Sequence, residues 1–298
     1  MNLDKTLSLQ SNSLIPILYP DRYETFVYPG GEVNVIMDLP DVISEDVIAV
    51  HRVTNAEKMM ELFLATDIIR SKMTHNAKLK VYLPYMPYGR QDRRTSPNQP
   101  DSLAVFAKML NCMQYNSVYT LDPHSKVQND KINNLFRVTH EHYIKRAIED
   151  FKPEVLVCPD EGAIKRVCTI SELYDIPVSF AEKVREPTTG RITHYEMVPS
   201  IINGKDTIFS APVQGLRALV IDDICDGGAT FILLGKALKK AKCEFFGLYV
   251  THGIFSKGFD SLVYPNGDYD KIYTTTSFRT LDKSKLGDLG QRIKQFPI

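Results

Sequence analysis

The chain has 298 residues, of which 43% are hydrophobic and 24% are charged, a mixture that is typical of a globular protein and not of a disordered one. Lysine and arginine together number 36, as do aspartate and glutamate, so the formal net charge is zero and gives no support to nucleic acid or an anionic membrane as a partner. The five cysteines are scattered and form no Cys-x-x-Cys pair, which favours reduced thiols and a cytoplasmic location over a disulfide framework or a zinc site.

The first half of the chain alternates between helical and strand-like segments. Residues 1–20 lack the continuous apolar region of a signal peptide, and no window reaches the apolar length that crosses a bilayer. From Ala56 onward, apolar residues recur at helical spacing behind Asn55, a residue type that favours the N-cap. The expected elements are a helix over 56–73, a strand over 79–84, a helix over 102–113 and a strand over 117–121.

The second half repeats this alternation. The expected elements are a strand over 154–158, a helix over 163–174, a strand over 217–221, a helix over 229–241, strands over 245–250 and 271–275, and a final helix over about 285–296. Because parallel strands need crossover helices, the pattern predicts two α/β domains, 1–146 and 147–298, each with a mainly parallel sheet flanked by helices. The longest irregular stretches, 89–100 and 182–193, have the length of binding loops or lids.

The sequence from Leu219 to Thr230 carries the strongest local signal. An apolar strand runs into the adjacent acids Asp222 and Asp223, and a loop of small residues then opens a helix. The residues of this loop are Asp226, Gly227, Gly228, Ala229 and Thr230. Ligands of open α/β sheets bind at the carboxyl ends of strands, and the N–H groups of a helix N-terminus favour a phosphate. The pattern therefore predicts a phosphate site whose two acids accept hydrogen bonds from neighbouring ribose hydroxyls.

This loop resembles the ribose-phosphate binding loop that phosphoribosyltransferases and ribose-phosphate pyrophosphokinases share, so by itself it leaves two chemistries open. Further segments resemble the pyrophosphokinases and follow one another in that family's order. They are Pro87-Tyr88-Gly89-Arg90-Gln91-Asp92-Arg93, Asp122-Pro123-His124, Pro159-Asp160-Glu161-Gly162-Ala163-Ile164-Lys165-Arg166, Lys183-Val184-Arg185 and Thr251-His252-Gly253-Ile254-Phe255-Ser256. The resemblance implies two phosphoribosyltransferase-like domains, a last helix that packs on the first domain, and a homo-oligomer, either a dimer or a hexamer.

The resemblance implies that the first half of the chain binds ATP. Arg90 and Gln91 would contact ATP, and His124 would help to hold its magnesium ion, Mg²⁺. Tyr28 would stack on adenine beside Glu32. The stretch between Tyr28 and Glu32 departs from the family's Phe-Ser-Asn-Gln-Glu, because two glycines replace the two amide side chains.

The resemblance assigns the second half to the acceptor and to catalysis. Asp160 would lie near a metal and the ribose, and the loop from Asp226 to Thr230 would hold the phosphate beside Asp222 and Asp223. Lys183 and Arg185 would be the catalytic pair of a flexible loop. A transferring diphosphate requires positioning and charge neutralisation, and two cations of this kind can supply both.

The reaction that the resemblance implies moves the β,γ-diphosphate of ATP to the anomeric hydroxyl of ribose 5-phosphate and releases AMP. Gly227 stands where the family commonly has a threonine, so a hydroxyl donor is lost and room is gained. A larger acceptor that ends in a ribose 5-phosphoryl unit, such as ADP-ribose, is therefore an alternative. A phosphoribosyltransferase would not need the Arg90-Gln91 segment, and a non-catalytic regulatory relative would have lost Lys183 and Arg185.

Overall fold

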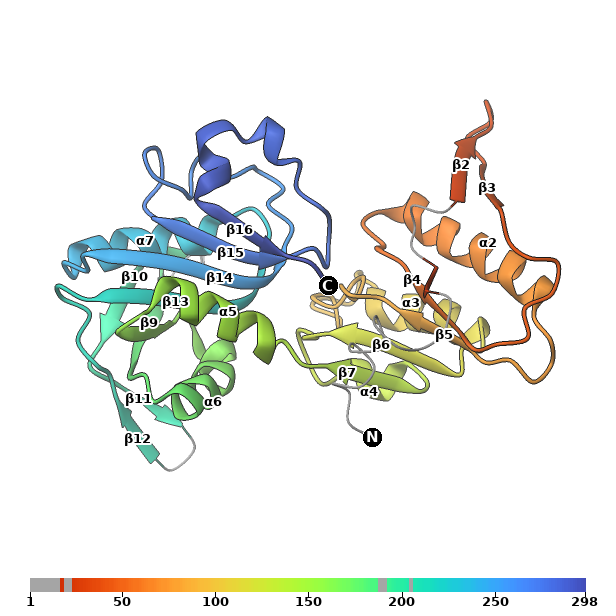
Figure 1. The fold of residues 1–298 in the computed structure, drawn as a ribbon. Coiled ribbons are helices and arrows are strands. Elements are labelled where there is room, and N and C mark those ends of the chain that lie inside the picture. Colours follow the sequence, from red (N-terminus) through yellow and green to blue (C-terminus); the bar gives the residue numbers. More distant parts are fainter. Residues whose placement is uncertain (1–16, 19–22, 187–191, 204–205) are drawn as a thin grey trace. The chain divides into compact units, whose positions relative to one another are not determined.

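The computed structural model describes residues 17–18, 23–186, 192–203 and 206–298. The chain divides into two compact units, Met1–His140 and Glu141–Ile298, each of which is described by itself (Figure 1). Most of the segment in which we expected no signal peptide, residues 1–20, lies outside the described part. In that described part, no helix has both the length and the apolar character needed to span a bilayer. All five cysteines are free thiols.

The first unit is built on a parallel sheet of five strands in the order β1-β4-β5-β6-β7. Its strands are β1 (Ile17–Leu18), β4 (Val47–Val50), β5 (Leu79–Tyr82), β6 (Ser117–Leu121) and β7 (Leu135–Val138). Its helices are α2 (Ala56–Lys72), α3 (Ser102–Cys112) and α4 (Gln128–Lys131). The predicted N-cap is confirmed, since the side chain of Asn55 accepts a hydrogen bond of 2.8 Å from the amide of Lys58. The two predicted helices and two predicted strands of this half are therefore confirmed.

A separate hairpin, which the sequence patterns did not predict, stands beside α2 in Figure 1. It consists of β2 (Tyr23–Val27) and β3 (Val33–Met37), which pair antiparallel. Its burial does not alternate cleanly, because Val27 and Ile36 are exposed while Val35 is buried. The hairpin therefore gives a weak period-two signal in the sequence.

The second unit is built on a sheet of seven strands in the order β10-β9-β8-β13-β14-β15-β16. All neighbours pair in parallel except β10 and β9. Its strands are β8 (Val155–Cys158), β9 (Val178–Arg185), β10 (Ile192–Val198), β13 (Arg217–Cys225), β14 (Phe245–Gly253), β15 (Lys271–Thr275) and β16 (Ile293–Phe296). Its helices are α5 (Glu141–Phe151), η3 (Glu161–Ala163), α6 (Ile164–Tyr174), α7 (Ala229–Lys240), η4 (Lys283–Lys285) and η5 (Gly287–Gln291).

The central strands are buried on both faces, as expected for a parallel sheet between helices. Val155, Val157 and Val220 pack in one cluster with Phe231 and Leu234 of α7. The opposite face meets α5, because a Cβ atom on Gly247 of β14 would lie 3.0 Å from the ring of Phe151. The predicted α/β architecture is confirmed in this unit.

The predicted final helix over 285–296 is wrong. The short 3₁₀ turns η4 and η5 lead instead into β16, which pairs in parallel with β15. Ile293 and Phe296 are three residues apart, which mimics a helical period, but both are buried at the two ends of a strand. Gly287, with φ of 51°, and Gly290 interrupt any helix before this point.

The predicted irregular loop over 182–193 is wrong in its described part. β9 continues through Arg185 and β10 begins at Ile192, while residues 187–191 lie outside the described part. Lys183 and Arg185, predicted to lie on a flexible loop, therefore lie on a strand of an antiparallel hairpin. Valine, phenylalanine, isoleucine and threonine in these two segments favour strands, and this preference outweighs the loop signal of the nearby glycine and proline.

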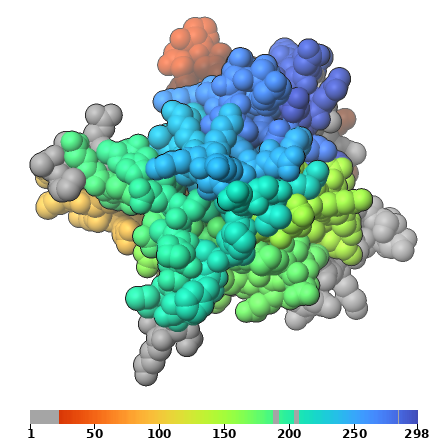
Figure 2. All heavy atoms as spheres, turned by 90° about the vertical axis from the view of Figure 1, so that its left-hand side faces the viewer, coloured from red at the N-terminus to blue at the C-terminus, as the bar shows by residue number. Residues whose placement is uncertain are grey.

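A second hairpin follows β10 and projects from the second unit, as Figures 1 and 2 both show. It consists of β11 (Ser200–Asn203) and β12 (Asp206–Phe209). Ile202 and Phe209 expose 80% and 77% of their surface on this hairpin. The sequence patterns did not predict it, because exposed apolar residues carry no core-facing period.

Candidate active site

The two adjacent acids lie on strand β13 and not after it. The predicted strand ended at Ile221, but β13 continues to Cys225, so Asp222 and Asp223 project from opposite faces near its carboxyl end. Asp222 accepts a hydrogen bond of 2.8 Å at Oδ1 from the amide of Asp223. Burial, and then the negative charges of Asp223 and Asp160, raise the pKa of Asp222 well above its ordinary value.

The loop after β13 leads directly into helix α7. Gly228 is its N-cap with φ of 79°, and a Cβ atom there would lie 3.2 Å from the side chain of Leu262. Both the left-handed backbone and this close approach require glycine. Gly228 has no side chain with which to cap this end of α7, and the first amides of a helix lack intrahelical acceptors. This geometry suits a phosphate, as the sequence predicted.

The predicted family segment Thr251–Ser256 braces this loop. Its end follows β14, and the amides of Ile254 and Phe255 donate to the carbonyl of Cys225 at 2.9 and 3.1 Å. Ser256 donates through its amide to the carbonyl of Asp226 at 3.2 Å and through Oγ to the carboxylate of Asp226 at 2.7 Å. These bonds fix the backbone of the loop before any ligand arrives.

Lys183 and Asp160 form an ion pair next to the acids. Asp160 follows β8, and its Oδ2 atom lies 2.5 Å from Nζ of Lys183 on β9. Burial lowers the pKa of Lys183, but its hydrogen bond with Asp160 and the nearby negative charges outweigh that effect and raise the pKa. Because β8 lies between β9 and β13 in the sheet, the structure brings Lys183, Asp160 and Asp222 together.

Arg185 lies two residues beyond Lys183 on β9, so both side chains project from the same face of the strand. Arg185 is exposed and stands opposite Ile192, next to an irregularity in the pairing of β9 with β10. Such irregularities re-aim side chains near active sites. Lys183 and Arg185 therefore point to the same side, but they do so from a strand and not from a loop.

Two residues that the sequence interpretation did not assign also reach this site. Tyr195 on β10 is paired with Lys183 across the two strands and is 97% buried, which raises the pKa of its hydroxyl. Arg166 on α6 places Nη2 4.0 Å from Oδ2 of Asp223. A strand prediction for 192–198 would have identified the element that carries Tyr195, but its position opposite Lys183 follows from the register of β9 and β10.

A cavity of about 410 Å³ lies beside Asp160. Phe180 and Ala181 of β9 and Ile201 of β11 contribute to its wall, so its surface is partly apolar. The hairpin that carries Ile201 thus lines the cavity next to Asp160, one of the residues predicted to bind the ribose phosphate.

In the first unit, Tyr28 and Glu32 close the turn of the β2–β3 hairpin. The amide of Tyr28 donates to the carbonyl of Glu32 at 2.8 Å, and the amide of Gly31 donates to the carbonyl of Tyr28 at 2.8 Å. The Tyr28 side chain is 47% exposed and meets Phe26 edge to face at 4.9 Å. An exposed aromatic ring and a carboxylate thus stand together at the tip of the hairpin.

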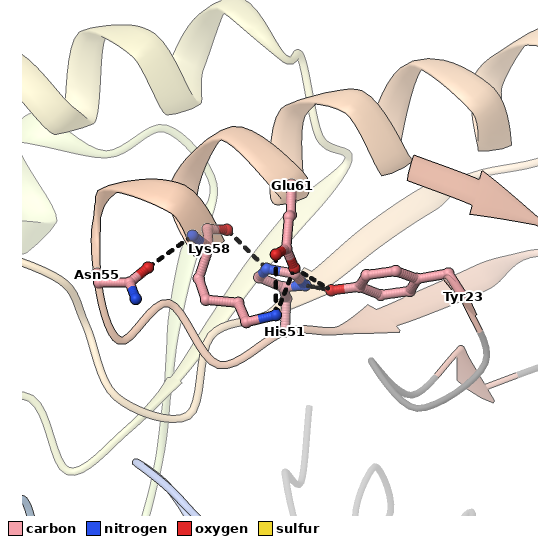
Figure 3. A network of polar contacts seen from close by, with 5 residues as sticks. All are labelled: Tyr23, His51, Asn55, Lys58 and Glu61. Atoms are coloured by element: carbon pink, nitrogen blue, oxygen red, sulfur yellow. Dashed lines mark hydrogen bonds and ion pairs between the residues drawn. The ribbon is translucent and has the colours of Figure 1, made fainter. Parts of the chain in front are cut away.

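A polar network anchors the base of this hairpin to α2 (Figure 3). The Tyr23 hydroxyl lies 3.1 Å from both Oε2 of Glu61 and Nδ1 of His51. Glu61 is fully buried and accepts bonds of 2.9 and 2.7 Å from Nζ of Lys58, and His51 Nε2 donates to the carbonyl of Lys58 at 2.8 Å. Burial has the largest effect on the pKa of His51 and lowers it.

The other residues predicted to bind ATP follow neighbouring parallel strands. Arg90 and Gln91 follow β5, and both are exposed. The carbonyl of Gln91 accepts from the amide of Leu103 at 3.1 Å. His124 follows β6 and is also exposed. The preceding Asp122 is buried with φ of 40°, and its Oδ1 lies 3.0 Å from Nδ1 of His140. Because β5 and β6 are adjacent, their carboxyl ends present these loops at one edge.

The donor chemistry at Asp160 suits magnesium. Mg²⁺ in nucleotide sites is commonly held by one or two carboxylates together with substrate phosphates and water. Asp160 offers such a carboxylate, with Lys183 as its partner in this structure. The described residues contain no cluster of three or more metal-binding side chains. His124 belongs to the first unit and Asp160 to the second.

Comparison with known proteins identifies both halves of the chain. A model described as the phosphoribosyl transferase domain matches residues 129–272, and one described as the N-terminal domain of ribose phosphate pyrophosphokinase matches residues 20–113. A ribose-phosphate pyrophosphokinase of Pyrococcus furiosus is 31% identical over 208 residues, which are 68% of this chain and 67% of the relative. The chain belongs to the ribose-phosphate pyrophosphokinase family. It is therefore a transferase of the pyrophosphokinase type.

Other comparisons agree with this family. A ribose-phosphate pyrophosphokinase of Saccharolobus solfataricus is 27% identical over 233 residues, which are 76% of this chain and 73% of the relative. The crystal structure of phosphoribosylpyrophosphate synthetase from Mycobacterium smegmatis matches with a TM-score of 0.73 at 17% identity, over 99% of this chain and 90% of that chain. The structural match supports the fold of two phosphoribosyltransferase-like domains that the resemblance implied.

Proposed function

We propose that this pyrophosphokinase transfers the β,γ-diphosphate of ATP to the anomeric hydroxyl of ribose 5-phosphate, giving phosphoribosyl diphosphate and AMP. The anomeric oxygen forms a bond to the β-phosphorus, and the bond from that phosphorus to the oxygen shared with the α-phosphate breaks. The observation that carries the proposal is the group formed by Lys183, Asp160 and Asp222 beside the N-terminus of α7. The names of the relatives support the substrates.

Each part of this group has a proposed task. The loop from Asp226 to Thr230 holds the 5-phosphate with its amides. Asp222 and Asp223 accept hydrogen bonds from ribose hydroxyls. Lys183 and Arg185 neutralise the diphosphate as it moves, a task for which the raised pKa of Lys183 keeps the ammonium charged.

We further propose that Tyr28, Glu32, Arg90 and Gln91 bind ATP in the first unit. His124 of the first unit would help to hold the Mg²⁺ of ATP, and Asp160 of the second unit would lie near a metal; a bound Mg²⁺ polarises phosphate oxygens. A homo-oligomer, either a dimer or a hexamer, and a cytoplasmic location are also proposed; the five free thiols are compatible with the latter.

The identity of the acceptor is tested by competition. The names of the relatives favour ribose 5-phosphate and give no support to a larger acceptor such as ADP-ribose. In the structure, the stem of Lys257 borders the space beside Gly227, since a Cβ atom there would lie 3.6 Å from its Cδ and Cε atoms. The space that Gly227 was predicted to leave for a larger acceptor is thus bordered by the side chain of Lys257.

The competition experiment offers ATP, Mg²⁺, ribose 5-phosphate and ADP-ribose at equal concentrations and identifies the products by mass. We expect the added diphosphate on ribose 5-phosphate, with AMP released in equal amount. A diphosphate found only on ADP-ribose would overturn the proposed acceptor but retain the chemistry. Formation of ADP in place of AMP would overturn the chemistry itself.

A further inference from the structure

The phosphate loop has an asymmetric set of charges. On one side, Asp160, Asp222 and Asp223 bring carboxylates to the carboxyl ends of β8 and β13. Within the loop, the carboxylate of Asp226 accepts a hydrogen bond from the hydroxyl of Ser256. Lys183 already pairs with Asp160, and Arg166 lies 4.0 Å from Asp223. An incoming sugar phosphate carries about −1.5 to −2 charge near neutral pH. A further cation that is not committed to a carboxylate would strengthen its binding.

Lys257 occupies the other side of the loop. A Cβ atom on Gly227 would lie 3.6 Å from Cδ and from Cε of Lys257 and 3.9 Å from its Cγ, so the outer part of the lysine stem runs alongside this glycine. The ammonium lies one bond, about 1.5 Å, beyond Cε. Lys257 is exposed, and within the described ranges its side chain makes no hydrogen bond or ion pair.

The backbone next to Lys257 is fixed to the loop. The preceding Ser256 bonds Asp226 through both its amide and its hydroxyl, at 3.2 and 2.7 Å. The amide of Gly258 donates to the carbonyl of Phe255 at 3.0 Å, which closes a turn around Lys257. The base of the lysine side chain is therefore held in place, while its ammonium remains free to meet a ligand.

We propose that Lys257 is a binding residue for the 5-phosphate of the acceptor. Its ammonium supplies, across Gly227, the donor that a hydroxyl-bearing residue at position 227 would otherwise provide. A lysine contributes three donors and a full charge, and it is a common phosphate ligand in proteins. This inference rests on the proposed function, because it assumes that a ribose 5-phosphate occupies the loop.

The test measures binding of ribose 5-phosphate by isothermal titration calorimetry, together with turnover, for the wild type and for Lys257→Met, Lys257→Arg and Lys236→Met. Methionine keeps most of the stem and removes the charge, and arginine keeps the charge. Lys236 is an exposed lysine on α7 of the same unit and serves as the matched control. We expect Lys257→Met to weaken binding roughly tenfold or more. Lys257→Arg should stay within about threefold and Lys236→Met within about twofold of the wild type.

A pH series separates a phosphate contact from a structural role. The second ionisation of a phosphate monoester has a pKa of about 6. The advantage of the wild type over Lys257→Met should therefore be largest near pH 7.5 and shrink toward pH 5.5. A loss of affinity that is independent of pH, or a Lys257→Met variant that binds as Lys236→Met does, would overturn the inference while wild-type turnover still upholds the proposed function. A wild type that neither binds nor converts ribose 5-phosphate would contradict both.

Discussion

At Asp222, the proposed binding of the ribose and the stability of the fold favour different side chains. Its carboxyl group lies among other acids, so burial and the charges of Asp223 and Asp160 raise its pKa. A carboxyl whose pKa is raised in the folded state stabilises the fold at low pH, and this stability is lost as the pH rises through the folded-state pKa. At neutral pH, Asp222 therefore lowers stability, which is the usual cost of a residue retained for binding.

Replacement of Asp222 by asparagine should separate these effects. Because the amide cannot ionise, Asp222→Asn should raise Tm by roughly 2–4 °C at pH 7, and this gain should disappear at and below about pH 4. The same variant should raise KM for the acceptor roughly tenfold through loss of a charge-assisted hydrogen bond to the ribose. Thermal unfolding and steady-state kinetics measure the two effects.

The control for this variant is Asp175→Asn, since Asp175 is exposed at the end of α6 and asparagine tolerates its left-handed backbone. It should change neither Tm nor KM. An Asp222→Asn protein that is less stable than the wild type at pH 7 would show that the ionised carboxylate of Asp222 stabilises the fold. An unchanged KM would remove Asp222 from the acceptor site.

Among the elements, β15 and β16 share one carboxylate partner on α5. Asp150 on α5 accepts hydrogen bonds from Lys271 of β15 at 2.6 Å and from Lys294 of β16 at 2.7 Å, and from the Tyr273 hydroxyl at 2.7 Å. Burial alone would raise the pKa of Asp150, but these bonds outweigh it and hold the pKa well below the ordinary value. The stability that Asp150 contributes is therefore present above about pH 4 and is lost as the pH falls below it.

The variant Asp150→Ala should loosen the C-terminal edge of the second sheet. We expect a loss of about 1–2 kcal/mol in the free energy of unfolding at pH 7, because three bonds to one charged acceptor are removed. Amide hydrogen exchange in residues 293–296 should become faster. Glu149→Ala on the same helix removes only an exposed pair with Lys145 at 3.8 Å and should cost less than about 0.5 kcal/mol. Equal protection of 293–296 in both variants would show that β16 is held by its ladder alone.

The elements that the sequence predicted correctly are those whose burial or capping leaves a pattern in the local sequence. The strands over 155–158 and 217–221 are buried on both faces, and α2 shows a helical period behind a cap, so local patterns define them well. The hairpin β2–β3 escaped prediction because its burial does not alternate, and β9–β10 escaped because nearby glycine and proline indicated a loop. The strand β16 was missed because its buried residues stand at a helical spacing. The site followed the same division: motifs identified Asp160, Lys183 and Asp222, but only the register of β9 and β10 places Tyr195 opposite Lys183.

At the scale of the whole molecule, the chemistry is divided between two units along the chain. The residues predicted to bind ATP lie in Met1–His140, and those predicted to bind the ribose phosphate lie in Glu141–Ile298. The match of residues 20–113 to a pyrophosphokinase-specific N-terminal model distinguishes the chain from a phosphoribosyltransferase, which shares only the second type of domain with it. Transfer of one intact diphosphate from ATP would therefore require both units of the chain.

The most direct test follows the phosphorus atoms by ³¹P NMR in a reaction of full-length protein with ATP, Mg²⁺ and ribose 5-phosphate. We expect AMP and a diphosphate attached to C1 of the ribose in equal amounts. We also expect Lys183→Ala to form both more slowly by roughly two orders of magnitude or more, with ATP binding retained, because this ammonium acts mainly in the transition state. Accumulation of ADP with a monophosphate on the sugar would rule out diphosphate transfer, and wild-type rates for Lys183→Ala would rule out a catalytic role for this lysine.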